Sequence, residues 1–447
     1  MARLFGTDGV RGEANTQLQP ELAYRLGRAA TIFFGQHHDG TPQILIGRDT
    51  RISGEMLEAA LVAGICSAGG NAILAGVIPT PAVAYLARKL HAAAGIVISA
   101  SHNPFHDNGI KFFGGDGYKL PDKVEDEIEK IVRDIERGKN FHRPTGVEVG
   151  HIERRQNLLE DYIGFVMSTT TERFDGMKIA LDCANGAAYK AMPAVLERLG
   201  AELILLGDNP NGININDNCG STHIENLRSA VLKNEADIGI AHDGDADRCL
   251  CVDERGAVID GDHIMIICAK LMTDVDALPD KTIVTTVMSN IGFRQAAEEL
   301  GLTYKITAVG DRYVLENMRA NGHKIGGEQS GHVIFSDYST TGDGLITALQ
   351  ILTAMKKSNA SASKLNALMT TYPQVLINVR VTNKAVCDTE AVKLAIAEGE
   401  LELGSTGRIL VRASGTEPLI RVMAEGPDKN QLNRICNKIA AEVEKCN

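Results

Sequence analysis

Residues 95–113 carry the side chains whose types and spacing point most directly to chemistry. An apolar run at 96–98 predicts a buried strand, and Asn103-Pro104 ends it and starts a loop. Ser101 is therefore expected at the carboxyl end of a strand, where open α/β sheets bind their ligands. The sequence predicts a reactive hydroxyl at this edge; an ordinary strand-ending turn with a capping serine is the alternative.

Polar and charged neighbours of Ser101 could bind or polarise an anion. They are His102, Asn103 and Lys111. A serine-hydrolase triad is disfavoured, because Ser101 and His102 are adjacent and would point to opposite faces of an extended segment.

Three carboxylates at alternating positions, Asp243, Asp245 and Asp247, follow another predicted strand. Oxygen ligands of this kind suit a hard divalent cation such as Mg²⁺. In an extended strand the outer two would lie roughly 13 Å apart at about 3.3 Å per residue, which is too far for one ion. We therefore expect a tight loop, which Gly244 and the small Ala246 permit.

An EF-hand is an alternative for this acidic segment, and so is a solvated acidic turn. The aspartates fit the first ligand positions of an EF-hand, and Glu254 falls at the twelfth. However, Arg248 stands where the sharp turn needs glycine, and 250–252 reads as a strand. The EF-hand is therefore disfavoured.

Two further loops carry groups suited to sugar and phosphate. A glycine-rich turn offers Glu328, Ser330 and His332, whose side chains can hydrogen-bond vicinal hydroxyls. A second turn combines two guanidinium groups with small residues whose N–H groups can form an anion nest. Its candidate phosphate ligands are Arg412, Ser414, Gly415, Thr416 and Arg421. Each loop taken alone could also be an unremarkable turn, and the N-terminal loop 6–12, with Arg11, is weaker still.

Three segments repeat a strand–helix–strand pattern that predicts largely parallel sheets covered by helices. Expected strands lie at 43–47, 71–75, 95–99, 178–182, 202–206, 237–241, 282–287, 303–306 and 324–326. Expected helices lie at 53–69, 80–90, 122–137, 188–200, 222–234, 291–300 and 311–321. The remaining tail has alternating strands near 374–382, 408–412 and 419–424 and a final amphipathic helix, which is typical of a small α+β domain.

Polar stretches at 138–150, 253–261 and 356–364 predict boundaries between four domains. The expected domains are 1–150 with the serine loop, 151–254 with the acidic loop, 255–364 with the glycine-rich loop and 365–447 with the arginine loop. The expected fold is α/β: three α/β/α domains with mixed, largely parallel sheets, and a smaller C-terminal α+β domain, around a shared central cleft.

Composition limits the classes of function. A net charge of −11 argues against a general nucleic-acid binder, though not against local basic pockets. No apolar run approaches the length of a membrane span, and the N-terminus lacks a signal-peptide core. Nine cysteines without a C-x-x-C pair fit reduced thiols. We expect a cytoplasmic protein that binds neither nucleic acid nor membrane, and a homodimer is possible.

Taken in order along the chain, these loops resemble those of the α-D-phosphohexomutase superfamily. The resemblance rests on Ser-His-Asn-Pro, Asp-x-Asp-x-Asp-Arg, Gly-Glu-x-Ser-Gly and Arg-x-Ser-Gly-Thr-Glu-Pro, and it spans essentially the whole length. The opening Leu-Phe-Gly-Thr-Asp-Gly-Val-Arg-Gly and the Asn-rich segment 209–216 are similar to the bacterial members that act on glucosamine phosphates. Ala246 departs from the glycine common in the superfamily, which leaves the geometry of the acidic loop open.

The resemblance implies an isomerase that interconverts glucosamine 6-phosphate and glucosamine 1-phosphate, feeding UDP-N-acetylglucosamine synthesis. Ser101 would be carried as phosphoserine and, with the three aspartates, would hold Mg²⁺. A glucosamine 1,6-bisphosphate intermediate would form and turn around within the site.

The resemblance also implies roles for the remaining residues. Arg11 and Lys111 would neutralise charge at the transferring group, and Lys111 or His332 would transfer the proton, with His102 close by. The sugar and the non-reacting phosphate would be bound by Arg248, Glu328, Ser330, Arg412, Ser414, Gly415, Thr416 and Arg421.

Other functions stay open on the sequence. Specificity for glucose or mannose phosphates is one alternative, and a metal-dependent sugar-phosphate phosphatase with water as acceptor is another. A binding protein without catalysis would need the sugar and phosphate loops but would have no use for a serine beside a metal site.

Overall fold

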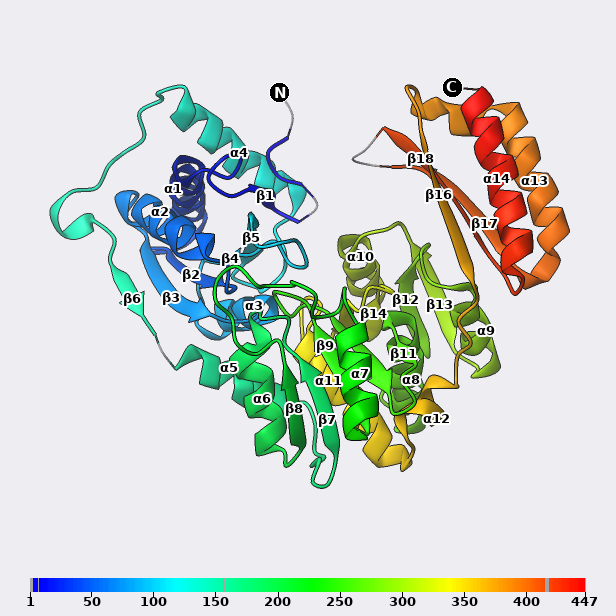
Figure 1. Cartoon of the computed structure of the whole chain (residues 1–447). Helices are drawn as coiled ribbons and strands as arrows, with labels where there is room; N and C mark the ends of the chain where they lie inside the picture. Colours follow the sequence, from blue (N-terminus) through cyan, green and yellow to red (C-terminus); the bar gives the residue numbers. More distant parts are fainter. Residues whose placement is uncertain (1–2, 7, 156, 415–417, 447) are drawn as a thin grey trace. The chain divides into compact units, whose positions relative to one another are not determined.

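The computed structural model describes residues 3–6, 8–155, 157–414 and 418–446 (Figure 1). It divides into two compact units. The larger unit comprises Met1–Met288 and Leu302–Ala367, and the smaller comprises Ser289–Gly301 and Leu368–Asn447. Within the described residues, no helix is both long and apolar enough to cross a membrane.

The first sheet of the larger unit has the strand order β1-β5-β4-β2-β3-β6. Its strands are β1 (Val10–Glu13), β2 (Gln43–Arg48), β3 (Asn71–Val77), β4 (Ala94–Ile98), β5 (Asp107–Gly114) and β6 (Ile152–Arg154). The strands β2, β3, β4 and β6 pair in parallel, whereas β5 runs antiparallel to both β4 and β1. The sheet is therefore mixed, with a parallel centre.

Helices cover both faces of this sheet. They are α1 (Pro20–His37), α2 (Ser53–Ser67), α3 (Thr80–Lys89) and α4 (Asp122–Glu136), and the 3₁₀ helix η1 spans Gly146–Glu148. Apolar residues of α1, α2 and α4 share one core on one face. On the other face, Val83 of α3 lies so close to Gly47 and Gly95 that a Cβ there would approach it to 2.6 and 2.8 Å. Glycine at these two strand positions allows α3 to pack directly on the sheet.

The second sheet has the order β11-β10-β9-β7-β8. Its elements are β7 (Lys178–Asp182), β8 (Glu202–Leu206), β9 (Ile238–His242), β10 (Cys249–Asp253), β11 (Val258–Ile259), α5 (Leu158–Met167), α6 (Ala188–Arg198) and α7 (Glu225–Asn234). Leu227 and Val231 of α7 pack on the strand residues Ala180 and Ala241. The strands β7, β8 and β9 are parallel, and β10 returns antiparallel to β9.

The third sheet has the order β13-β12-β14-β15. Its elements are β12 (Thr282–Thr286), β13 (Thr303–Thr307), β14 (Ile325–Gly327), β15 (Val333–Phe335), α8 (Gly261–Asp274), α10 (Asp311–Asn321), α11 (Gly344–Ser358) and α12 (Ala362–Asn366). Again the centre is parallel, and β15 returns antiparallel to β14. The helices α8 and α11 begin at aspartate caps, because the carboxylates of Asp260 and Asp343 each accept two backbone N–H groups.

The smaller unit is an antiparallel sheet, β16-β18-β17, with helices packed on it. Its elements are β16 (Gln374–Arg380), β17 (Arg408–Ala413), β18 (Leu419–Glu425), α9 (Ile291–Glu299), α13 (Glu390–Leu403), α14 (Lys429–Lys445) and the 3₁₀ helices η2 (Lys384–Asp388) and η3 (Gly404–Thr406). Leu432, Ile435, Cys436, Ile439 and Val443 of α14 lie in its core, as the helical spacing predicts.

The expected α/β class is confirmed, and so are the expected strands and helices to within a few residues. Two of the three polar stretches expected at domain boundaries hold regular structure. Residues 356–364 hold the end of α11 and the start of α12, and 253–261 hold β11 and the start of α8. The helices α1, α5, α8, α11 and α13 were not among the expected elements. The three boundaries between the four expected domains stay predictions.

Candidate active site

Ser101 lies in the connection between β4 and β5, at the carboxyl end of the parallel strand β4. It is buried and its φ is +52°, in the left-handed region. Its N–H donates to Ser99 Oγ (3.0 Å) and its hydroxyl donates to Asp243 Oδ2 (2.6 Å). The turn therefore presents the hydroxyl directly to the acidic loop.

The expectation that Ser101 and His102 point apart is wrong. The two residues form a turn and not an extended segment, because Ser101 adopts a left-handed conformation. Ser101 Oγ and His102 Nδ1 are 3.3 Å apart. Burial, followed by the charges of Arg248 and Arg11, lowers the pKa of His102 to about 4, so that the ring is neutral at neutral pH.

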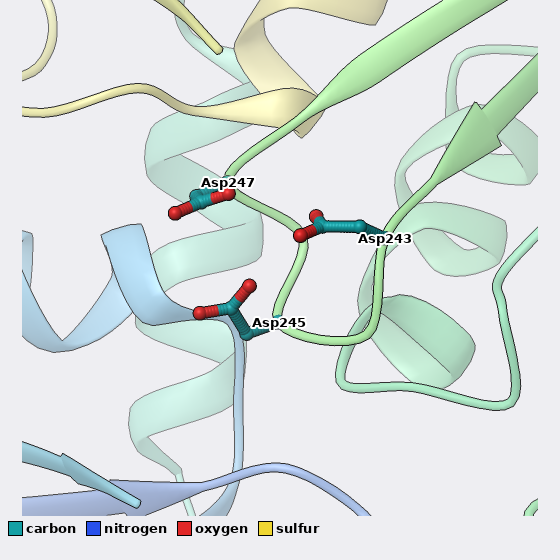
Figure 2. Close-up of side chains that lie close together, drawn as sticks. All are labelled: Asp243, Asp245 and Asp247. Carbon is teal, nitrogen blue, oxygen red and sulfur yellow. The ribbon is translucent and has the colours of Figure 1, made fainter. Parts of the chain in front are cut away.

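The acidic residues Asp243, Asp245 and Asp247 follow β9 in one curled loop, and Figure 2 shows their carboxylates close together. One ligand oxygen from each lies within 4.8 Å of the others. The expected tight loop is confirmed, and Ala246 contributes to it with a φ of +59°. This left-handed backbone is what glycine would adopt without strain.

Protein groups orient two of these carboxylates through one oxygen each. Asp245 Oδ2 accepts from Lys111 Nζ (2.6 Å) and from the Thr80 hydroxyl (2.7 Å). His332 Nδ1 lies 3.5 Å from Asp247 Oδ2. The other oxygens, Asp245 Oδ1 and Asp247 Oδ1, are buried without a hydrogen-bond partner in the described part of the chain. Buried carboxylate oxygens of this kind fit a divalent cation as their missing partner.

The three negative charges of the acidic loop repel one another. Burial, followed by the charges of Asp247 and Asp245, raises the pKa of Asp243 well above its usual value. Burial acts in the same direction on Asp245, but the ammonium group of Lys111 outweighs it and lowers the pKa of Asp245. A bound divalent cation would relieve this repulsion between the three carboxylates.

Lys111 and Arg11 reach the site from the antiparallel strands β5 and β1 of the first sheet. Lys111 is buried; burial alone would lower its pKa, but the charges of Asp245 and Asp247 raise it. Arg11 Nη2 lies 3.3 Å from Asp8. The ammonium group of Lys111 is thus fixed as a cation beside the acidic loop.

Glu328, Ser330 and His332 lie in the connection between β14 and β15. The Gly310 N–H donates to Glu328 Oε1 (3.1 Å), and burial raises the pKa of Glu328. The Ser330 hydroxyl is buried, and no protein group in the described residues bonds to it. It is therefore available to a ligand hydroxyl or phosphate.

His332 lies between two carboxylates, Asp247 on Nδ1 and Asp311 on Nε2, at 3.5 and 3.4 Å. Burial by itself would lower its pKa, but these charges raise it to about 9. At the same time the Gly342 N–H donates to Nε2 (3.0 Å), which suits the neutral ring. The surroundings therefore favour both protonation states, as a group that exchanges a proton requires.

The sequence analysis missed several buried groups around the site. Lys119 Nζ bridges Asp8 (3.0 Å) and Asp311 (2.6 Å), and Thr80 orients Asp245. No motif marks these residues, because each acts through a contact that only the folded chain creates. Arg248, which was expected to bind substrate, has a buried guanidinium 3.9 Å from Asp247.

The predicted phosphate-binding residues lie in the smaller unit. Arg412 on β17 and Arg421 on β18 are directly opposed cross-strand partners. Burial, followed by the charge of Arg421, lowers the pKa of Arg412. The Lys384 Nζ donates to the Ser414 carbonyl (2.5 Å), which adds a third cation to this edge. Gly415 and Thr416 lie outside the described residues.

The Ser101 hydroxyl thus lies beside three clustered carboxylates, and comparison with known proteins identifies the class of protein. Four models of phosphoglucomutase/phosphomannomutase domains match: domain I at residues 2–139, domain II at 160–256, domain III at 260–372 and the C-terminal domain at 376–442. The chain belongs to this family of phosphohexomutases. Within the superfamily, it is 52% identical over 446 residues to the phosphoglucosamine mutase of Brevibacillus brevis, with 99% of each chain covered. The chain therefore groups with the bacterial phosphoglucosamine mutases, which confirms the resemblance seen in the sequence.

Solved structures show the same fold. A phosphoglucomutase/phosphomannomutase family protein from Burkholderia thailandensis superposes with a TM-score of 0.81 at 24% identity, covering 100% of this chain and 98% of that chain. The N-acetylphosphoglucosamine mutase of Aspergillus fumigatus, in complex with GlcNAc-6P and magnesium, gives a TM-score of 0.71 at 17% identity, covering 99% and 96%. Phosphohexomutases are metal-dependent, and this chain has the acidic triad.

Proposed function

We propose that this protein interconverts glucosamine 6-phosphate and glucosamine 1-phosphate through a phosphoserine at Ser101 and a glucosamine 1,6-bisphosphate intermediate. Its product would feed UDP-N-acetylglucosamine synthesis. The choice of the amino sugar rests on the relatives that are about 52% identical along the whole chain. The observation that carries the mechanism is the Ser101 hydroxyl, 2.6 Å from a carboxylate of the acidic triad.

The reaction moves a phosphoryl group twice. The phosphoryl group on Ser101 Oγ passes to the 1-hydroxyl of the sugar, which gives up its proton to a base. The bisphosphate then turns around, and its 6-phosphoryl group passes to Ser101 Oγ, while the 6-oxygen takes up a proton. No water or phosphate is consumed, so the net reaction is an isomerisation.

Asp243, Asp245 and Asp247, together with an oxygen of the phosphoserine, would hold Mg²⁺. The fit is supported by two buried carboxylate oxygens that no described residue hydrogen-bonds, and by the mutual repulsion of the three charges. The ion would supply neutralising charge and polarise the phosphoryl group. Lys111 and Thr80 orient Asp245 by donating hydrogen bonds to its Oδ2 atom.

His332 and Lys111 are the proposed groups for proton transfer and charge neutralisation. His332 is supported by its balanced surroundings, since Gly342 favours the neutral ring and two carboxylates favour the cation. Lys111 is better suited to a fixed positive charge, because Asp245 and Asp247 raise its pKa. Arg11 and the neutral ring of His102 would complete the surroundings of the transferring group.

Sugar and distal phosphate would be bound by separate loops. Glu328 would offer the sugar a carboxylate, and Ser330 a buried hydroxyl that has no hydrogen-bond partner in the part of the chain that the structure describes; Arg248 provides positive charge nearby. The opposed guanidinium groups of Arg412 and Arg421 favour an anion between them, because like charges on paired strands repel. Ser414, Gly415 and Thr416 would complete this phosphate loop. A homodimer stays a prediction.

The test is ³¹P NMR of the purified protein with Mg²⁺, glucosamine 6-phosphate and a trace of glucose 1,6-bisphosphate. We expect a sugar 1-phosphate signal without free phosphate, and none of it from the Ser101→Ala variant. Glucose 6-phosphate in a parallel sample measures the preference for the amino sugar. Inorganic phosphate as the main product would mean that water is the acceptor and that the mutase proposal is wrong.

A further inference from the structure

The Asn-rich segment 209–216 has no role in the mechanism above, yet it is rigidly built. Asn214 Oδ1 accepts the N–H of Asn211 (2.9 Å), so that the segment closes on itself. The Gly212 carbonyl accepts the N–H of Ile52 (2.9 Å), at the start of α2. The segment, which follows β8 of the second sheet, therefore contacts the start of α2 beside the first sheet, close to the Ser101 turn.

Asn216, at the end of this segment, contacts the backbone of the Ser101 turn. Its Nδ2 donates to the carbonyls of Ser101 (2.9 Å) and Asn103 (3.0 Å). Arg51 Nη2 donates to the same two carbonyls, at 3.1 and 2.6 Å. Asn216 and Arg51 are both buried. Donors from two separate parts of the chain thus converge on one turn.

This turn needs external support, because Ser101 has a positive φ, which is unfavourable for a residue other than glycine. The hydrogen bonds from Asn216 and Arg51 fix the carbonyls on either side of His102, and Arg51 is itself paired with the buried Asp49. They hold the backbone in the one conformation that directs Ser101 Oγ toward Asp243.

Asn216 also contacts the acidic loop. A Cβ at Gly244 would lie 2.6 Å from the Ser101 carbonyl and 2.8 Å from Asn216 Nδ2. Only glycine lets the acidic loop pack this closely against the two groups. Asn216 therefore lies where the serine turn, the acidic loop and the Asn-rich segment meet.

We propose that Asn216 is a positioning residue that aligns the phosphoryl group on Ser101 with the metal-binding carboxylates. This role rests on the proposed phosphoserine mechanism. It predicts that loss of the Asn216 amide slows phosphoryl transfer while leaving sugar binding intact, because the amide bonds to the backbone of the turn and, among the described residues, to none of the predicted sugar or phosphate ligands.

The test compares Asn216→Gly with the matched control Asn218→Gly. Both asparagines have positive φ, 58° and 52°, so glycine removes each side chain without backbone strain. The side chain of Asn218 is exposed, and its Nδ2 donates to Asp217 Oδ1 (2.9 Å). For wild type and both variants, kcat and KM for glucosamine 6-phosphate are measured with Mg²⁺, together with the thermal unfolding midpoint.

We expect Asn216→Gly to lower kcat on the order of 10²-fold, because small displacements of reacting groups cost that much. KM should stay within about twofold, and Asn218→Gly should match the wild type. The ³¹P resonance of the phosphoserine should shift on Mg²⁺ addition in the wild type and in Asn218→Gly, and shift less in Asn216→Gly. A kcat for Asn216→Gly equal to that of the control overturns the role.

A second variant covers the case in which Asn216→Gly does not fold. Asn216→Asp keeps the volume and tolerates positive φ, but it presents an acceptor to two carbonyl oxygens; wild-type kcat in this variant would overturn the proposal. If the wild type releases inorganic phosphate and forms no 1-phosphate, the proposed function is wrong. The rate of phosphate release is then compared between Asn216→Gly and Asn218→Gly. In this way a failure of the proposed function is distinguished from a failure of the positioning role of Asn216.

Discussion

Ionisation of Asp343 should make the free energy of unfolding of the larger unit depend on pH. The substitution Asp343→Asn should remove this dependence. Its carboxylate caps α11 by accepting the N–H groups of Leu345 and Ile346, and it also accepts the Tyr162 hydroxyl. Burial, despite these hydrogen bonds, raises the pKa of Asp343 to about 6. The cap matters to the site, because the next N–H, from Gly344, donates to the Ala246 carbonyl of the acidic loop.

The magnitude follows from the difference between the pKa of Asp343 in the folded protein, about 6, and the usual pKa of 3.8 for this group. At about 1.4 kcal/mol per pKa unit, ionisation costs the folded protein on the order of 3 kcal/mol. Because the folded pKa is the higher one, the stabilising contribution is complete below the unfolded pKa and is lost as pH rises through the folded pKa. Between about pH 4.5 and about pH 7.5 the loss is roughly 2 kcal/mol.

Asp343→Asn keeps an acceptor for the cap and cannot ionise. The free energy of unfolding of this variant, relative to wild type, should therefore increase by roughly 2 kcal/mol across the same pH range. Urea unfolding followed by circular dichroism, in buffers without divalent cations, measures the difference. Asp428→Asn, at the solvent-exposed cap of α14, is the matched control for cap chemistry. A difference between Asp343→Asn and wild type that is independent of pH would refute the reasoning.

Three further substitutions probe other predicted functional residues and their neighbours. Arg412→Ala should raise KM for glucosamine 6-phosphate about tenfold or more with little change in kcat, since a charged hydrogen bond contributes about 1.5–3 kcal/mol; an unchanged KM would contradict the phosphate role. Ala246→Gly should raise the free energy of unfolding by up to about 1 kcal/mol, because glycine relieves the positive φ; a lower denaturant midpoint would contradict this. Gly342→Ala should lower kcat, because its Cβ would lie 2.5 Å from His332 Nε2, whereas Gly164→Ala, with open space around it, should not; equal rates in the two variants would exclude a catalytic position for His332.

The chemistry-bearing loops could be predicted from the sequence because local patterns mark them. Three of them follow the third parallel strand of a sheet along the chain and begin where an apolar run ends, at Ser99–Ser101, Asp243 and Glu328, whereas the arginine loop joins two antiparallel strands. The acidic loop could even be predicted to curl, since one ion cannot bridge an extended strand. The returning antiparallel strands β5 and β15 were not foreseen; β15 has only three residues, too few for a periodic signal, and β5 is buried along most of its length and therefore does not alternate.

The contacts that complete the site could not be predicted, since they join residues far apart in sequence. Lys111 and Asp245 are 134 residues apart, and Ser101 and Asp243 are 142 apart. Thr80 is an unremarkable helix-start residue until folding brings its hydroxyl to Asp245. Periodicity and motif spacing predict local structure only. These contacts, in contrast, depend on how the three sheets of the larger unit pack together.

The same type of connection positions a functional loop in each of the three sheets of the larger unit. In each sheet a parallel strand is followed by a loop and an antiparallel neighbour, and the loops β4–β5, β9–β10 and β14–β15 carry the serine, the carboxylates and the proposed sugar-binding groups. A hairpin connection anchors its loop on both sides by ladder hydrogen bonds, so its side chains are held more firmly than in a long crossover. Lys111 is an example, because it lies on the antiparallel strand β5 and its ammonium group donates to Asp245 Oδ2. Phosphoryl transfer depends mainly on position and charge, and a repeated rigid connection supplies both without a dedicated scaffold for each loop.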